Sequence, residues 1–293
     1  MAATLGLGTV QFGMRYGVSN QDGKVLAEEA RAILVDAAAA GCSVLDTAHH
    51  YGDSEAVLGR CAATRQFRVV TKTPQFEPQE LDAKAAAALR SAFERSLDQL
   101  AAKQVYGLLA HSADDLLKPG GDRLWAEMQS LKAEGSVQRI GASIHAGTQA
   151  VALLERYRLD LIQVPLNIFD QRLLRSGILS DLRRSGVEIH ARSAFLQGLL
   201  LMPPGKAPVW FDPIRPLLRK FHASAVERNL SPLVAALTFV RDHGDVDAIV
   251  VGVTGRQQFA ECLAAFRSSS SFDGEGFACD DPRFVNPALW RLA

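Results

Sequence analysis

The chain has 293 residues, of which 48% are hydrophobic and 22% are charged. This length suits two ordinary domains or one α/β barrel, and the apolar content is sufficient for a large core. Lysine and arginine together number 32, as do aspartate and glutamate, so no net field favours nucleic acid or an anionic membrane as a partner.

Short β-rich segments alternate with longer helical segments along the whole chain. The expected strands are residues 5–10, 43–48, 68–73, 105–112, 137–144, 159–166, 187–194 and 248–253. The expected helices are residues 26–37, 54–63, 78–100, 116–134, 148–157, 170–184, 213–228, 232–243 and 256–266.

Several residues are expected to begin, end or break these helices. Gly41 is predicted to close the first helix, and Asp53 or Ser54 to cap the second. Pro78 is predicted to start the third helix, and the Pro-Gly-Gly sequence at 119–121 to interrupt the fourth. The proline-rich residues 197–213 are the longest irregular stretch before the tail.

Eight strand signals, each followed by a helical segment, favour a closed (β/α)8 TIM barrel. We expect a single domain over residues 1–293, in which residues 268–293 form a C-terminal tail that packs on the surface or frays. A doubly wound open sheet is the alternative architecture. It would normally show a G-x-G-x-x-G turn after its first strand, whereas Gly6 and Gly8 lie within a strand-like segment.

The cysteines and the N-terminus indicate the compartment. The first ten residues, M-A-A-T-L-G-L-G-T-V, contain no basic region, and no run in the chain approaches the roughly 18 apolar residues of a membrane span. The cysteines are widely spaced without a C-x-x-C pair, so we interpret them as small buried hydrophobes in a reducing, cytoplasmic environment, with no metal site. They are Cys42, Cys61, Cys262 and Cys279.

Four polar side chains follow consecutive predicted strands. Asp46, Lys72 and His111 stand at or just past the C-terminal ends of the second, third and fourth strands, and Tyr51 lies in the loop after the second. Because the C-terminal strand ends of a barrel form one active-site face, we expect these four side chains to meet there.

This cluster suits acid catalysis at a carbonyl group. An ammonium near a phenol lowers the phenol pKa from its usual value near 10, and a carboxylate beside the amine keeps the amine charged. An imidazole could add a hydrogen bond that orients the carbonyl, while a hydride from a cofactor attacks its carbon. The alternatives are a structural ion pair, a loop-anchoring tyrosine and a core histidine, or a lyase that uses Lys72 as a Schiff-base amine.

The same residues carry a family resemblance. The motif D-T-A-x-x-Y-G-x-S-E at 46–55, V-T-K at 70–72 and the histidine after the fourth strand resemble the aldo-keto reductase superfamily. The segments L-G-L-G-T near the start and I-V-V-G-V-T near the end are also similar to it. The resemblance spans residues 5–266.

The resemblance implies an activity and roles for the four residues. It implies a barrel that binds a nicotinamide cofactor, usually NADPH with NADH not excluded, and transfers hydride from nicotinamide C4 to an aldehyde or ketone. Tyr51 would be the general acid, Lys72 and Asp46 would tune it, and His111 would orient the carbonyl. An aldose dehydrogenase running in the oxidative direction and a cofactor-binding regulatory subunit stay open as alternatives.

Cofactor positions follow by the same resemblance. Ser143 and Gln163 would contact the carboxamide, although Ile144 replaces the asparagine of the family. Arg192 stands where the family places a tyrosine that stacks on nicotinamide, and a planar guanidinium could stack there instead. Arg256 is the candidate for the 2′-phosphate of NADPH, or else a solvated arginine at a helix start. The other expected cofactor contacts are Ser193, Gln197, Gly198, Gly252, Thr254, Gln258 and Glu261.

The substrate pocket is less clearly indicated. Val10 occupies the position of a tryptophan in the family, and Trp210 and Phe211 lie in the irregular stretch, where they could form a lid or pack the loop down. Phe12 and His49 complete the candidate walls. We expect a small-molecule carbonyl substrate, sugar-like or aryl, and no nucleic acid or membrane partner; the sequence does not indicate an oligomeric state.

Overall fold

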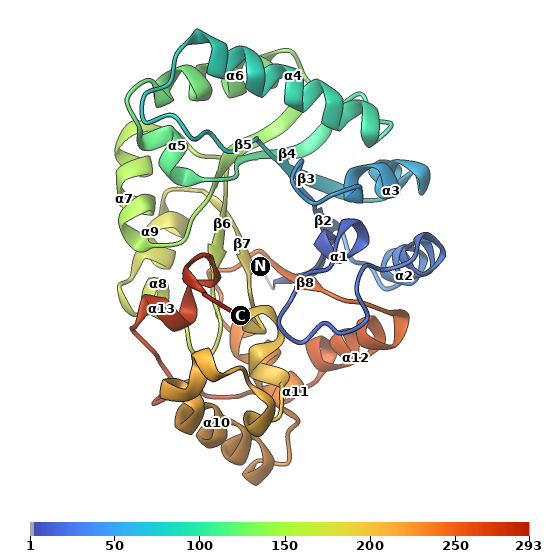
Figure 1. The fold of residues 1–293 in the computed structure, drawn as a ribbon, viewed down its shortest axis with the longest axis vertical. Helices are drawn as coiled ribbons and strands as arrows, with labels where there is room; N and C mark the ends of the chain where they lie inside the picture. Colours follow the sequence, from blue (N-terminus) through green and yellow to red (C-terminus); the bar gives the residue numbers. More distant parts are fainter. Residues whose placement is uncertain (1–2, 293) are drawn as a thin grey trace.

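The structure is a computed structural model that describes residues 3–292. Eight parallel strands close into a barrel in the order β1 to β8, surrounded by helices (Figure 1), so the predicted single-domain (β/α)8 TIM barrel is confirmed. The strands are β1 (Thr4–Gly8), β2 (Val44–Asp46), β3 (Arg68–Lys72), β4 (Val105–Ala110), β5 (Val137–Ser143), β6 (Leu161–Pro165), β7 (Glu188–Arg192) and β8 (Ala248–Gly252).

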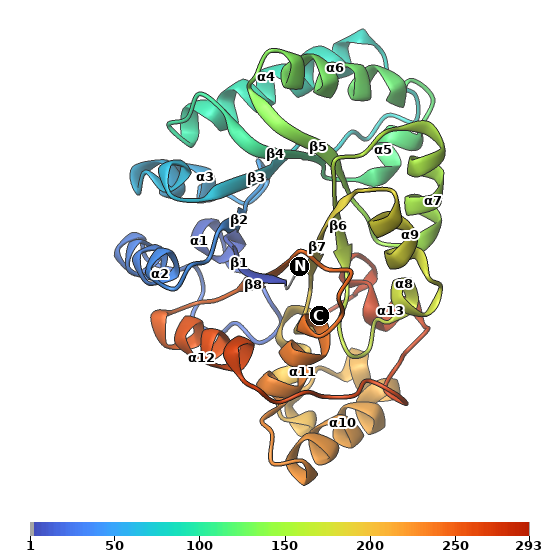
Figure 2. The same ribbon diagram turned by 180° about the vertical axis from the view of Figure 1, so that it is seen from behind.

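The α-helices follow the strands in sequence and form the outer layer, which Figure 2 shows from behind. They are α1 (Val10–Gly13), α2 (Ala27–Ala39), α3 (Ser54–Arg60), α4 (Ala83–Gln99), α5 (Ala113–Leu117), α6 (Gly121–Ala133), α7 (Gly147–Arg156), α8 (Arg172–Arg175), α9 (Ile178–Arg184), α10 (Arg215–Glu227), α11 (Pro232–Arg241), α12 (Arg256–Arg267) and α13 (Pro282–Val285). The predicted irregular stretch holds three 3-10 turns, η2 (Leu196–Leu201), η3 (Pro204–Lys206) and η4 (Val209–Ile214).

Several predicted boundaries are wrong for identifiable reasons. Helix α4 starts at Ala83 and not at Pro78, because the Asp82 side chain accepts hydrogen bonds from the first free backbone N–H groups. The helix predicted at 170–184 is divided into α8 and α9 at Gly177, whose φ of +77° interrupts the helical backbone. Asp53 occupies the N-cap position of α3, but its side chain pairs with Lys24 at 2.6 Å and does not cap.

The core has two parts. The barrel interior near its base is filled by valine, leucine and alanine side chains, namely Val44, Val70, Leu109, Leu161 and Ala248. The larger part lies between strands and helices. The tail joins it: Phe272, Phe277 and Phe284 are buried, and the indole of Trp210 donates to the carbonyl of Arg283. The tail therefore packs and does not fray.

Two further findings concern the described residues. None of the helices in residues 3–292 has the length and apolar character needed to cross a membrane. The four cysteines are free thiols; Cys42 and Cys262 are buried, as expected, whereas Cys61 and Cys279 are only half-buried.

The strand register sets the positions of the polar side chains at the C-terminal end of the barrel. Asp46 is paired with Gly8 of β1 and with Val70 of β3, and Lys72 follows two residues later on β3. Ser143 and Gln163 are direct partners at the ends of β5 and β6. Because all strands are parallel, these residues reach the same mouth of the barrel.

A close backbone contact holds the loop that carries Tyr51. A Cβ atom on Gly13 would lie 1.7 Å from the carbonyl oxygen of Tyr51, and one on Gly52 would lie 2.4 Å from the carbonyl oxygen of Gly13. Gly52 also has a φ of +58°, which disfavours any other residue. The loop after β2 is therefore fixed directly against α1.

We predict that Gly13→Ala lowers the free energy of unfolding by about 1–3 kcal/mol, since the new methyl group must displace backbone. Urea unfolding followed by circular dichroism measures this. Gly244→Ala is the matched control, because nothing lies within 4 Å of a Cβ there. Equal stabilities of the two variants would contradict the described contact.

Candidate active site

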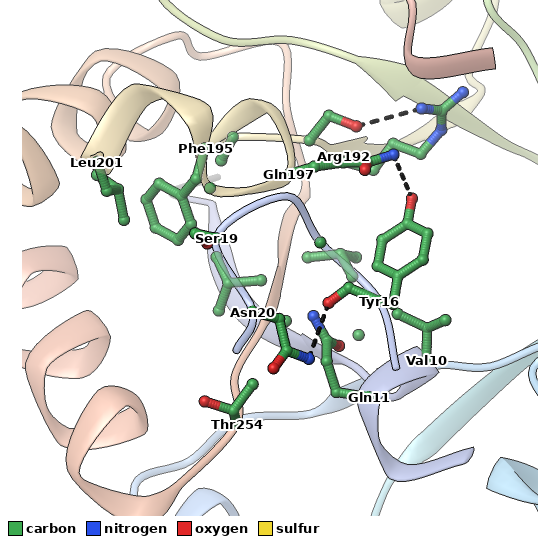
Figure 3. Close-up of a pocket in the computed structure, with 18 of the residues that line it drawn as sticks. Val10, Gln11, Tyr16, Ser19, Asn20, Arg192, Phe195, Gln197, Leu201 and Thr254 are labelled. Carbon is green, nitrogen blue, oxygen red and sulfur yellow. Dashed lines mark hydrogen bonds between the residues drawn. The ribbon is translucent and has the colours of Figure 1, made fainter. Parts of the chain in front are cut away.

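A cavity of about 680 Å³ opens at the C-terminal end of the barrel. It is lined by the ends of several strands, by the loop after β1, by the loop after β7 and by α12. Figure 3 shows the part between the two loops, where the Tyr16 hydroxyl accepts a hydrogen bond from Gln197 Nε2 at 2.9 Å. The cavity therefore runs from the barrel mouth to the start of α12.

A buried ion pair lies at the base of this cavity. Lys72 Nζ donates to Asp46 Oδ1 at 2.5 Å and to the carbonyl oxygen of Thr47 at 3.0 Å. Gln163 Nε2 donates to the same carboxylate oxygen at 2.7 Å. Burial lowers the pKa of Lys72, and the adjacent Asp46 carboxylate opposes that shift. The pair is thus held by three strands, β2, β3 and β6.

Tyr51 lies above the ion pair. Lys72 Nζ is 5.0 Å from the centroid of the Tyr51 ring, so the cation faces the ring. The pKa of Tyr51 is raised and not lowered as expected: burial is the main cause, Asp46 adds to the rise, and Arg192 opposes it. The charge of Lys72 is balanced by Asp46 at 2.5 Å, so desolvation decides the direction. Tyr51 is a neutral phenol at physiological pH.

His111 faces Tyr51 from the end of β4. The two ring centroids are 5.9 Å apart and the rings are nearly perpendicular. Burial lowers the pKa of His111 to about 3, and the charge of Lys72 contributes further. The imidazole is therefore neutral, and its Nδ1 atom has no hydrogen-bond partner within residues 3–292. A neutral imidazole can donate one hydrogen bond without adding charge.

Most of the predicted cofactor residues line this same cavity. Ser143 Oγ donates to Gln163 Oε1 at 3.3 Å. The loop after β7 has left-handed φ values at Ser193 (61°) and Gln197 (54°), which bend it over the cavity. The predicted cofactor residues that line the cavity are Ser143, Gln163, Arg192, Ser193, Gln197, Gly198, Gly252, Thr254, Gln258 and Glu261.

Arg256 and four of the five predicted wall residues lie elsewhere. Arg256 is exposed and pairs with Asp36 at 2.7 Å on α2. Phe12 and Phe211 are 0% and 1% exposed, so their side chains belong to the core. His49 stacks edge-on with His50, and Trp210 packs against Phe284 in the tail. Of the predicted walls, Val10 alone is among the residues that line the cavity in the described part of the chain.

The structure adds residues to the lining that the sequence interpretation missed. Gln11, Tyr16 and Asn20 come from the loop region after β1, His145 follows β5, and Lys206 belongs to the loop after β7. A usable signal was present in the sequence. The polar segment after the first strand lies at a C-terminal strand end, the same argument that selected Asp46 and Lys72.

The residues present fit a nicotinamide dinucleotide. The amide of Gln11 has a buried Oε1 atom with no partner within the described residues, and it faces the backbone of Gly252. Ser143 and Gln163 offer a further polar pair at the catalytic end. Within residues 3–292, no group of three or more histidine, cysteine or acidic side chains could hold a metal ion.

Fold and sequence together define the class of protein. The family model described as "Aldo/keto reductase family" matches residues 4–275, which is nearly the whole chain. The chain therefore belongs to the aldo/keto reductase family and is an NAD(P)H-dependent oxidoreductase that acts on carbonyl compounds.

Particular relatives agree with this assignment. The chain is 23% identical over 271 residues to an NADH-specific methylglyoxal reductase of Escherichia coli (strain K12), covering 81% of this chain and 82% of that protein. Among solved structures, an aldo-keto reductase from Bacillus halodurans in its holo form has a TM-score of 0.73 at 20% identity, covering 94% of this chain and 89% of that one. A putative aldo-keto reductase from Pseudomonas aeruginosa has a TM-score of 0.67 at 23% identity, covering 90% of each chain.

We predict a pH dependence of stability that involves His111. Its folded pKa of about 3 lies below the usual 6.5, so between these values the unfolded chain binds a proton that the folded chain does not. The contribution of the neutral His111 to the free energy of unfolding is therefore complete above pH 6.5 and is lost as the pH falls. Urea unfolding between pH 4.5 and 7.5 should show a slope shallower by about 1 kcal/mol per pH unit in His111→Gln. If the free energy of unfolding of the wild type and of His111→Gln depended on pH in the same way, the buried neutral imidazole would be contradicted.

Proposed function

We propose that the protein reduces a small aldehyde or ketone, with Tyr51 as the proton donor. One observation supports this most strongly: Tyr51, His111 and the Lys72–Asp46 pair share one end of a cavity that continues to α12. When bound along this cavity, the nicotinamide cofactor supplies a hydride to the carbonyl carbon. The chain must then supply a proton to the carbonyl oxygen.

Tyr51 would give up its hydroxyl proton as negative charge develops on the substrate oxygen. Burial holds this proton on the phenol before the reaction, which keeps the donor loaded. The phenolate left behind is stabilised by the Lys72 ammonium 5.0 Å from the ring centroid. Asp46 keeps that ammonium oriented and protonated through its 2.5 Å contact.

His111 would orient the substrate carbonyl. Its ring is perpendicular to that of Tyr51, with centroids 5.9 Å apart, so both can address one oxygen atom. Because the imidazole is neutral at physiological pH, it donates a hydrogen bond and does not compete with Tyr51 as an acid.

The lyase alternative is less well supported. Lys72 Nζ donates to Asp46 Oδ1 and to the Thr47 carbonyl, so the amine is held against the end of β2 at the base of the cavity. A Schiff-base amine must be deprotonated to attack. The ion pair favours the charged form of Lys72, which suits electrostatic support of Tyr51.

We infer a preference for NADH over NADPH. Glu261 lines the α12 end of the cavity, where its carboxylate would repel a 2′-phosphate and accept hydrogen bonds from ribose hydroxyls. Arg256, the expected phosphate partner, is paired with Asp36 outside the cavity lining. The Escherichia coli relative named as NADH-specific supports the same preference. A small 2-oxoaldehyde such as methylglyoxal is a suitable first substrate.

We predict that Tyr51→Phe lowers kcat for aldehyde reduction by about 100-fold or more, because the general acid is removed. Steady-state assays at saturating cofactor measure this, and a fluorescence titration should give an unchanged cofactor Kd. Tyr157→Phe is the matched control, since its hydroxyl donates to the Leu116 carbonyl away from the cavity. Turnover near that of the wild type in Tyr51→Phe would refute the acid assignment.

We predict that wild-type protein binds NADH more tightly than NADPH by about 10-fold or more, and that Glu261→Gln reduces this ratio by weakening the charge repulsion. Fluorescence titration with each cofactor gives both constants. Arg256→Ala should change the two constants equally. Tighter binding of NADPH than of NADH by the wild type would contradict this preference. A selective loss of NADPH binding in Arg256→Ala would show that Arg256 binds the 2′-phosphate.

A further inference from the structure

Arg192 is a cation in the cavity wall that has no carboxylate partner within residues 3–292. It is half-buried at the end of β7, and its guanidinium donates to the carbonyl oxygen of Ile144 at 2.9 Å. It also contacts His145 Nδ1 at 3.0 Å and Ser193 Oγ at 3.3 Å, as part of the wall in Figure 3. All three partners are neutral.

The acids in the neighbourhood are engaged by other residues. Asp46 accepts from Lys72 and Gln163, and Asp170 is bound by two nitrogens of Arg172, each at 2.8 Å. His145 does not supply a negative charge, and its own pKa is lowered to about 4 by burial and by the charge of Arg192. The three neutral acceptors therefore orient the guanidinium without neutralising it.

A partly desolvated cation without a counter-ion is unusual, because buried charges in proteins are normally paired. Two acceptors, the Ile144 carbonyl and His145 Nδ1, take hydrogen bonds from Nη2, so an anion would be held by the charge and by the N–H groups of Nε and Nη1 that remain available. A second donor is available across the cavity: the Tyr16 hydroxyl accepts from Gln197 Nε2, which leaves its own proton free to donate. Arg192 and Tyr16 thus offer charge and a hydrogen bond to one anionic group.

The catalytic residues lie within reach of this charge. Arg192 lies at the end of β7 in the same cavity lining as Tyr51 and His111, and its charge acts on both. The anion site is therefore at the catalytic end of the cavity and not at the α12 end. A substrate with its carbonyl at Tyr51 would carry its anionic group towards Arg192.

We propose that Arg192, assisted by Tyr16, selects carbonyl substrates that carry a carboxylate, such as oxo acids and carboxylated aldehydes. This inference rests on the proposed function and adds the substrate class. The other anion available to the same guanidinium is a phosphate of the cofactor, so the test separates substrate binding from cofactor binding.

The first measurement compares para-carboxybenzaldehyde with para-formylbenzamide, which share a ring and an aldehyde and differ in charge. Wild-type protein should reduce the carboxylate with a kcat/KM higher by about 10-fold or more, the scale of a charge-assisted hydrogen bond. Glyoxylate and methylglyoxal form a second pair with a shorter spacing. Arg192→Gln should remove the preference, because kcat/KM falls more for the carboxylate than for the amide.

Two variants control for loss of structure. Arg192→Lys keeps the charge but loses the three contacts that orient the guanidinium, so it should retain part of the preference. Arg184→Gln removes an exposed arginine that pairs with Asp181 on α9, and it should behave like wild type. Wild-type activity without a preference for either carboxylate would overturn the inference. So would an increase in the KM for NADH with equal losses on both substrates, which would assign Arg192 to the cofactor.

Calorimetry keeps the inference testable if no aldehyde is reduced and the proposed function fails. Benzoate should bind to the NADH-saturated protein more tightly than benzamide, and Arg192→Gln should remove that difference. Benzoate binding that is unchanged in Arg192→Gln would overturn the anion site. If Arg192→Gln lost benzoate binding and the wild type reduced no aldehyde, the anion site would stand and the proposed carbonyl reduction would be rejected.

Discussion

The buried ion pair between Lys72 and Asp46 organises the catalytic end of this barrel. Taking two charges out of water is unfavourable unless geometry and further hydrogen bonds compensate. Here the Thr47 carbonyl accepts a second hydrogen bond from the ammonium, and Gln163 donates one to the carboxylate. Because Gln163 also accepts from Ser143, the network continues from β2 and β3 to β5 and β6. One set of contacts thus joins the proton-transfer end to the residues predicted to hold the cofactor.

The electrostatics of the cavity follow from burial as much as from charge. Desolvation keeps His111 and His145 neutral and keeps the proton on Tyr51, while the cations are Lys72, Arg192 and Lys206. In the proposed reaction, the cations beside the neutral phenol would stabilise the negative charge that moves from the substrate oxygen to the phenol. This differs from a phenol that is already acidic, although both arrangements use the same residues.

The loop that carries Tyr51 and the loops that line the cavity are held by different contacts. The barrel and α1 fix the Tyr51 loop through backbone contacts at Gly13 and Gly52. The cavity walls come from two loops that touch each other, since Val18 N donates to the Gln197 carbonyl and a Cβ on Gly198 would lie 1.9 Å from Ser19 Oγ. Asp46, Lys72 and Gln163 thereby come from strands, whereas the loops after β1 and β7 supply other parts of the cavity lining.

The sequence by itself determined the barrel, the order of its elements and the position of Asp46, Tyr51, Lys72 and His111 at one end of it. Each of these depends on local pattern: strand and helix periodicity along the chain, and polar residues at strand ends, which parallel pairing must bring to one face. It did not determine the pKa of Tyr51, because burial is a property of packing. Nor could it separate Phe12 and Phe211, which face the core, from Tyr16, which faces the cavity. Loop residues are positioned by contacts between segments far apart in the chain, as Tyr16 is by Gln197. In the same way, the neighbours of Arg192 come from distant segments, so the sequence could not indicate that this side chain is without a counter-ion among the described residues. Those contacts exist in the tertiary structure alone.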